Sequence, residues 1–155
     1  MGDLAELARA SDETVARARR ELVDGVRRAA ARGMSQRAIA REIGRSQPEV
    51  SRLLRFHAST PLGLRLRAAR DDVRQAVANA GGSNVRVFGS VARESDVDGS
   101  DIDLLFSPDR PLSLMELSAL EDEISVLVGH PVDLVPDTAL RESMRQRILD
   151  EAVAL

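Results

Sequence analysis

Acidic side chains recur on two apolar stretches in the second half of the chain, at a spacing that could hold a metal ion. Asp101 and Asp103 alternate with apolar residues over 101–106, and Asp133 lies within the apolar run 131–135. Alternate residues of a strand point to one face, so the first two aspartates should project side by side. Adjacent carboxylates repel each other unless a cation lies between them, and Mg²⁺ prefers such oxygen ligands together with phosphate oxygens.

A glycine–serine pair follows a third apolar stretch and could hold phosphate. Gly89 and Ser90 come directly after the expected strand 85–88, and Arg93 follows three residues later. Glycine lets the backbone approach a phosphate closely, while N–H groups, a hydroxyl and a guanidinium can donate hydrogen bonds to its oxygens. Each feature alone has an ordinary explanation, as a turn, a solvated loop or a salt-bridge partner. Their order and spacing together favour one site.

The segments F-G-S-V-A-R, S-D-I-D-L-L and P-V-D-L-V resemble the pattern of the minimal nucleotidyltransferase family, part of the polymerase-beta-like superfamily, over roughly residues 64–155. The resemblance implies that Gly89, Ser90 and the nearby arginine bind the triphosphate of ATP. It also implies that the aspartates of the D-x-D pair ligate Mg²⁺, and that Asp133 completes the metal site or acts as a base.

One departure from the family pattern lies beside this site. Family members often carry glycine directly after the arginine, and here the residue is Glu94. The loop that follows adds Asp96 and Asp98. These carboxylates are either solvated or weaken the binding of a triphosphate.

The elements that would position these residues alternate between helix and strand. Besides the three strands, apolar residues at helical spacing predict helices over 64–80 and 113–128, and Asp137 is expected to cap a final helix. The order helix–strand–strand–helix–strand–helix predicts a small mixed sheet with packed helices. The fold class expected for this half is therefore α+β or α/β, as in the nucleotidyltransferase fold.

The first half of the chain is expected to be all helix. A helix is predicted over 11–32, and the segment 34–56 resembles the helix-turn-helix of bacterial repressors, with Ser35 and Ser46 as caps and Gly44 in the turn. A helical hairpin that only packs or dimerises is the alternative. The side chains expected to contact bases or phosphates of DNA are Arg45, Ser46, Gln47, Ser51, Arg52 and Arg55.

The sign of the net charge changes soon after the boundary between the two patterns. Residues 1–70 hold 15 arginines against 8 acidic residues, while residues 71–155 hold 7 arginines against 17 acidic residues. A basic half suits DNA and an acidic half suits a divalent cation. We therefore expect two modules, a helix-turn-helix domain over 1–60 and a nucleotidyltransferase domain over 61–155, with the boundary in the breaker-rich stretch 59–63.

Composition excludes some classes of protein. The chain has no cysteine, which excludes disulfides and cysteine-based zinc sites. It has no apolar run near the ~20 residues of a membrane span and no signal-peptide pattern at its start, so we expect a cytoplasmic protein with no membrane contact.

The resemblance and the domain pattern together imply a specific function. We expect a Mg²⁺-dependent enzyme that moves AMP from ATP to a partner protein, as the antitoxin of a HEPN-type toxin, and that binds its operator DNA as a homodimer. One alternative is a DNA-binding transcriptional regulator whose nucleotidyltransferase domain is inactive or only senses nucleotide. Another is an enzyme that modifies a small molecule such as an aminoglycoside.

Overall fold

The computed structural model describes residues 2–97 and 99–155, and the chain divides into two compact units, Met1–Leu54 and Arg55–Leu155. Each unit has its own apolar core. No helix in the described part of the chain is both long enough and apolar enough to cross a membrane. Asp98, named above in the loop after Arg93, lies outside the described residues.

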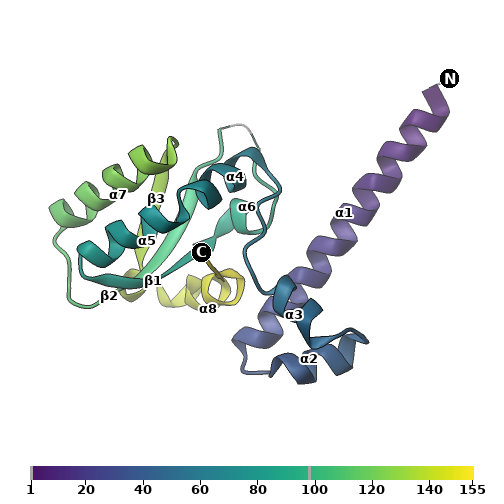
Figure 1. Ribbon diagram of the computed structural model, residues 1–155, viewed down its shortest axis with the longest axis horizontal. Helices are drawn as coiled ribbons and strands as arrows, with labels where there is room; N and C mark the ends of the chain where they lie inside the picture. Colours follow the sequence, from purple (N-terminus) through teal and green to yellow (C-terminus); the bar gives the residue numbers. More distant parts are fainter. Residues whose placement is uncertain (1, 98) are drawn as a thin grey trace. The chain divides into compact units, whose positions relative to one another are not determined.

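The first unit consists of three helices (Figure 1), α1 (Gly2–Ala31), α2 (Gln36–Ile43) and α3 (Gln47–Leu53). The expected caps are confirmed: the Ser35 side chain accepts a hydrogen bond from the Ala38 N–H, and Gly44 ends α2 in the left-handed conformation. Ser46 and Glu49 form a reciprocal capping box at the start of α3. The helix α1 begins well before the expected residue 11, because the expectation considered apolar residues only from Val15 onward.

The core of the first unit is small and aliphatic. One face of α1 packs against α2 and α3 through side chains that are at least nine-tenths buried: Val26, Ile39, Ala40, Val50 and Leu53. Only the C-terminal part of α1 contributes to this core, since residues 3–15 are all exposed.

The second unit contains a four-stranded sheet of β1 (Gly82–Phe88), β2 (Ile102–Pro108), β3 (Val132–Pro136) and β4 (Val153–Ala154). The strand order is β3-β2-β1-β4, in which β2 and β3 are parallel and the other pairs are antiparallel. The mixed sheet predicted from the sequence is therefore confirmed. The helices of this unit are α4 (Pro61–Ala68), α5 (Arg70–Asn79), α6 (Gly89–Ala92), α7 (Leu114–Val128) and α8 (Glu142–Glu151).

The main core lies on one face of this sheet. Val87, Leu104 and Leu134, from three neighbouring strands, pack with apolar side chains of α5 and α7. A serine cap and a left-handed glycine define the two ends of α7, at Ser113 and Gly129. The face of the sheet away from α5 and α7 is therefore available for polar side chains.

Three details of the second unit differ from the sequence-based expectations. The helix expected over 64–80 is two helices that meet at Ala69. Asp137 does not cap α8, whose N-cap is Arg141, because its carboxylate instead accepts hydrogen bonds from Arg86 at 2.9 Å and Ser107 at 2.5 Å. The strand β4 was not predicted, since two residues are too few to show a periodicity.

Candidate active site

Gly89 lies at the corner where β1 ends and α6 begins. Its φ of +71° is in the left-handed region, where a side chain would be strained. A Cβ atom at this position would also overlap the carboxylate oxygen Oδ2 of Asp103. Backbone conformation and the approach of Asp103 therefore both require glycine here. The sequence led us to expect a close approach at Gly89, and in this structure the approaching group is a carboxylate.

Strand register brings aspartates from β2 and β3 together. Asp103 is paired with Asp133 across the parallel strands and with Phe88 across β1 and β2. Paired residues of neighbouring strands point to the same face of a sheet, with backbones about 5 Å apart. Ile102 and Leu104, on either side of Asp103, are fully buried in the core on the opposite face. Asp103 and Asp133 therefore share the face that α5 and α7 leave open.

Asp101 lies one residue before β2 begins, slightly outside the strand expected for it. Its side chain is exposed, whereas that of Asp103 is half-buried. The charge of Asp101 still acts on Asp103 and raises the pKa of the Asp103 carboxyl. The three aspartates singled out from the sequence thus lie in one negatively charged region.

The environment raises the pKa of Asp103 to about 6, from an ordinary value of 3.8. Burial of the carboxyl is the largest cause, and the negative charges of Asp133, Asp101 and Glu151 add to it in that order. The positive charge of Arg93 opposes the increase. A carboxyl group whose pKa is strongly shifted by burial and by specific charged neighbours is typical of a functional site.

Glu151, the last residue of α8, binds two groups at the glycine–serine corner. Its Oε1 accepts a hydrogen bond from the Gly89 N–H at 3.2 Å, and its Oε2 accepts one from the Arg93 guanidinium at 2.9 Å. Our sequence reasoning missed this residue. A carboxylate in the last turn of a helix meets the negative end of the helix dipole, and that unfavourable position is the signal that could have identified it.

The remaining residues of the corner lie on the short helix α6 and the turn after it. Ser90 is half-buried, and its carbonyl accepts a hydrogen bond from the Ser95 N–H at 2.9 Å. Arg93 ends α6 and bonds Glu151 with its side chain. Gly89 and Arg93 therefore lie close to Asp103, and Ser90 follows Gly89 directly on α6.

Glu94 adopts a left-handed conformation, with φ of +56°. Glycine tolerates this conformation at no steric cost, which gives a physical reason for glycine at this position in the family pattern. In the same loop, one carboxylate oxygen of Asp96 is buried without a hydrogen-bond partner among the described residues. The loop thus combines one strained backbone position with one buried carboxylate oxygen that has no hydrogen-bond partner among the described residues.

The carboxylate oxygens at this site are the kind of ligand that magnesium prefers. Within residues 2–97 and 99–155, no group of three or more His, Cys, Asp and Glu side chains is arranged to enclose a metal ion. Mg²⁺ usually takes one or two carboxylates, with water and substrate phosphates as its other ligands, so an all-protein cage is not required. Asp103 and its neighbours Asp101 and Asp133 could supply the carboxylates. A cation there would also offset the repulsion that raises the pKa of Asp103.

Known proteins are similar to part of this chain. A protein of Methanocaldococcus jannaschii named "Putative protein adenylyltransferase" is 35% identical over 68 residues, which are 44% of this chain and 69% of that protein. "Protein adenylyltransferase MntA" of Thermococcus cleftensis is 33% identical over 69 residues, which are 44% of this chain and 70% of that protein.

A solved structure agrees with these sequence matches. It is described as "Structure of putative minimal nucleotidyltransferase" and resembles this chain with a TM-score of 0.56 and 35% identity, over 64% of this chain and 100% of that one. Residues 66–155 match the family described as "Nucleotidyltransferase domain". This match includes the glycine–serine corner, all three aspartates and Glu151. The chain therefore belongs to the nucleotidyltransferase domain family and is an enzyme of this kind.

Proposed function

We propose that this nucleotidyltransferase transfers AMP from ATP to a hydroxyl group of a partner protein, with Mg²⁺ at the aspartates. The observation that carries the proposal is the strand register that pairs Asp103 with Asp133 directly beside Gly89. Phosphoryl-group chemistry of this kind depends mainly on positioning and on neutralising charge, and clustered carboxylates next to a glycine corner suit both requirements.

The reaction forms one bond and breaks one bond. The acceptor oxygen bonds to the α-phosphorus of ATP, and the bond from that phosphorus to the bridging oxygen breaks, so pyrophosphate leaves with the electron pair. Asp101 and Asp103 would hold the metal, which supplies charge neutralisation at the phosphates. Asp133 is exposed beside Asp103, so it either adds an oxygen ligand or accepts the proton of the hydroxyl.

A protein is the acceptor that best fits the described unit. The described part of Arg55–Leu155 holds a four-stranded sheet with its helices, which offers little surface to enclose a nucleic acid or an antibiotic. Similar proteins carry the name protein adenylyltransferase, which supports the same class of acceptor.

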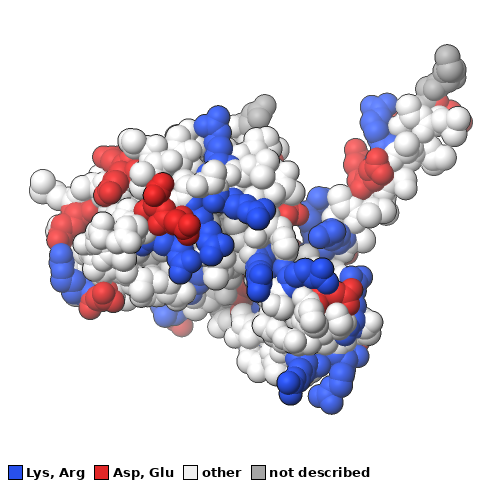
Figure 2. Space-filling view, viewed as in Figure 1, with Lys and Arg blue, Asp and Glu red and all other residues white. Residues whose placement is uncertain are grey.

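We propose further that the first unit binds operator DNA through α3. Basic side chains gather over α2 and α3 on the face seen in Figure 2. Arg45, Gln47 and Arg52 are exposed in the first unit and would contact phosphates or base edges, as would the exposed Arg55, which follows this unit directly. Ser46 forms the cap of α3 and Ser51 is half-buried, so these two residues would act mainly by shaping the helix.

DNA binding and protein modification combine naturally in an antitoxin. Such a protein would add AMP to its toxin, a ribonuclease of the HEPN type, and would repress the operon that encodes both. This part of the proposal rests on the family resemblance and on the pairing of the two units. Binding to two operator half-sites would require a homodimer.

A second candidate function is favoured by the contacts of Glu151. This carboxylate bonds the Gly89 N–H and Arg93, the groups that we propose for the triphosphate. If Glu151 keeps those groups occupied, nucleotide would bind weakly and without transfer, and the protein would act as a DNA-binding regulator that senses nucleotide.

Transfer of label from ATP separates the two candidates. The full chain is mixed with its candidate toxin, Mg²⁺ and ATP labelled on the α-phosphate, and label on protein is measured. We expect label on the toxin with the unchanged chain and a loss of at least about 100-fold with Asp103→Asn, because this change removes a charge that stabilises the transition state. Asp122→Asn, on the exposed surface of α7, is the matched control and should retain full transfer.

Two results would count against the enzymatic proposal. Equal transfer by the Asp103→Asn variant and the unchanged chain would exclude a role for the aspartates. Binding of nucleotide by the unchanged chain, with no label on any protein or small-molecule acceptor, would favour the sensor.

A further inference from the structure

The N-terminal half of α1 has no partner within the described part of the first unit. Residues 3–15 are all exposed, and α2 and α3 pack only against the C-terminal part of the helix, as Figure 1 also shows. An isolated helical segment of this length is marginal in water, since most helical stability in proteins comes from packing of an apolar face. The segment therefore needs a surface that the first unit does not itself supply.

The exposed segment carries apolar residues at helical spacing. Leu4, Leu7 and Val15 are 79%, 65% and 65% exposed. With Ala8 between them, they form a stripe that continues along the same helix into Leu22 of the core region. One face of α1 is thus covered at its C-terminal end and open at its N-terminal end.

Charge along α1 is divided between its two ends. Residues 2–13 carry four acidic side chains and one arginine, while residues 14–31 carry five arginines and two acidic side chains. Two copies of this helix side by side in opposite directions would bring each acidic end against a basic end. Two copies in the same direction would bring like charges together, which is unfavourable.

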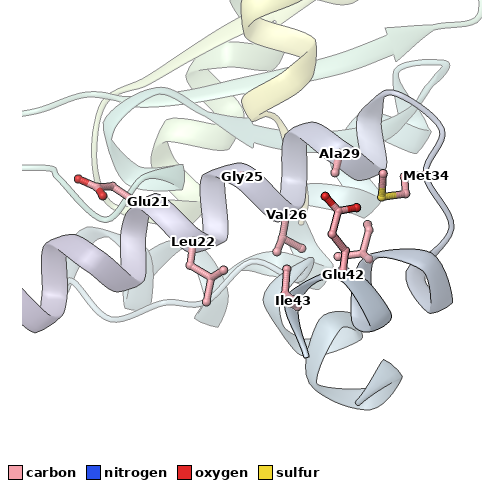
Figure 3. A pocket seen from close by; sticks show the side chains of 9 residues that line it. Glu21, Leu22, Gly25, Val26, Ala29, Met34, Glu42 and Ile43 are labelled. Atoms are coloured by element: carbon pink, nitrogen blue, oxygen red, sulfur yellow. The ribbon is translucent and has the colours of Figure 1, made fainter. Parts of the chain in front are cut away.

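An apolar cavity lies where such a partner helix would end. It has a volume of about 280 Å³ and lies between α1 and α2. Figure 3 shows that Leu22 and Val26 on α1 and Ile43 on α2 line it, with Glu21 and Glu42 also among the lining residues. Leucine side chains near the start of a second α1 helix could fill this cavity.

We propose that a second copy of the chain binds antiparallel along α1, with Val15 of each copy facing Val15 of the other across a two-fold axis. In this register Leu7 faces the Leu22–Val23 region of the second copy, so each leucine-bearing end fills the other copy's cavity. Asp12 then lies beside Arg19 of the second copy, because both residues are within about 60° of Val15 around the helix, so opposite charges meet on both sides of the axis. The dimer surface contains none of the residues assigned to transfer or to DNA contacts, and it would supply the homodimer that operator binding requires.

Cysteine cross-linking of the full chain tests the direction of pairing, because the natural chain has no cysteine. The variant Val15→Cys should form a disulfide-linked dimer under mild oxidation, since the two thiols meet at the axis. Leu4→Cys should not, because two residues at position 4 would lie about 33 Å apart in the antiparallel pair, far beyond disulfide reach. Leu114→Cys, at an exposed apolar position of the second unit, is the control for random collision and should also stay monomeric on a denaturing gel.

Sedimentation equilibrium tests the affinity. Val15→Asp should raise the dimer dissociation constant on the order of 100-fold, because a central interface residue and its symmetry mate both become charged. Leu114→Asp is the matched control and should leave the dimer intact. Circular dichroism should show less helix for Val15→Asp than for Leu114→Asp at protein concentrations where the unchanged chain is dimeric, because the N-terminal half of α1 loses its covering surface.

A charge-swap experiment tests which charged residues of the two α1 helices lie beside each other. Asp12→Arg should weaken the dimer, and adding Arg19→Asp should restore it. A chain that is monomeric at high micromolar concentration, a dimer that survives Val15→Asp, or cross-linking of Leu4→Cys as readily as Val15→Cys would each overturn the proposal. The last result would indicate parallel helices, and the first would mean that a different protein covers α1.

Discussion

At the scale of single residues, the surroundings of Asp103 make the ionised form of its carboxyl group unfavourable. Its carboxyl is half-buried among other carboxylates, and its pKa is raised from 3.8 to about 6. Folding therefore favours the protonated form. This contribution to stability is fully present below pH 3.8 and is lost as the pH rises through about 6. At neutral pH the protein keeps a carboxylate that destabilises its own fold, which is common where a site must bind a cation.

Removing this charge should stabilise the protein while abolishing transfer. At pH 7 we expect Asp103→Asn to raise the free energy of unfolding by on the order of 1 kcal/mol, a figure reduced for solvent screening because the side chain is only half-buried. Below pH 3.8 the gain should vanish, since the natural aspartate is then protonated. Urea denaturation at pH 7 and below pH 3.8 measures the difference in unfolding free energy between the variant and the natural chain at each pH. A gain of the same size at both pH values would mean that charge is not the cause.

Gly89 should tolerate no side chain. Gly89→Ala combines a left-handed backbone with overlap of the Asp103 carboxylate, so we expect a loss of more than about 2 kcal/mol in unfolding free energy, together with loss of transfer. Gly129→Ala is the matched control, because Gly129 has the same φ of +71° and only an ordinary contact with Arg65. It should cost about 1 kcal/mol and leave transfer intact. Equal effects of the two variants would argue against the overlap.

At the scale of elements, a single register decides how the site is assembled. The parallel pairing of β2 with β3 aligns Asp103 with Asp133, and a shift by one residue would turn one of them into the core. Buried neighbours on both strands oppose such a shift, since Ile102 pairs with Val132 and Leu104 with Leu134. The apolar alternation that builds the core therefore also holds the carboxylates together.

The helix α3 should act separately from this sheet. Arg52→Ala is expected to weaken operator binding about 10- to 100-fold, as for loss of a base contact, and to leave AMP transfer unchanged. Gel-shift titration at fixed salt and the label-transfer assay measure the two activities. Arg74→Ala, on α5 of the second unit, is the control and should alter neither. Equal loss of DNA binding and transfer in Arg52→Ala would contradict independent roles for the two units.

At the scale of the whole molecule, two apolar cores support two units. The core of the first unit lies among its three helices, and that of the second lies between the sheet and helices α5 and α7. The division between them falls at Leu54 and Arg55, six residues before the boundary expected from breaker residues. Phe56 explains the difference, because it packs against the second core although it precedes the breaker-rich stretch.

The second unit should therefore fold alone, and its stability should depend on residues 55–60. A fragment of residues 55–155 is expected to unfold cooperatively, while a fragment of residues 61–155 should be less stable by about 2 kcal/mol. The shorter fragment lacks Phe56 and also Thr60, whose side chain caps α4. Thermal and urea unfolding measure the stability of the two fragments. Equal stability would mean that residues 55–60 are only a connection between the units.

Much of the site could be predicted from the sequence because its signals are local. The glycine–serine corner, the alternation around Asp101 and Asp103, and the caps Ser35, Ser46 and Gly129 each depend on a few adjacent residues. Short-range steric and hydrogen-bonding rules determine such features, so they can be identified before any long-range contact is known.

Only the tertiary structure decided which distant groups meet. Glu151 contacts Gly89 and Arg93 across about sixty residues of sequence, and Asp137 bonds Arg86 and does not cap a helix. The pKa of Asp103 likewise depends on charges from three separate segments. Electrostatic and hydrogen-bonding energies depend on distance in space, and the packing of β4 and α8 against β1 and the α6 corner sets those distances only once the whole unit has folded.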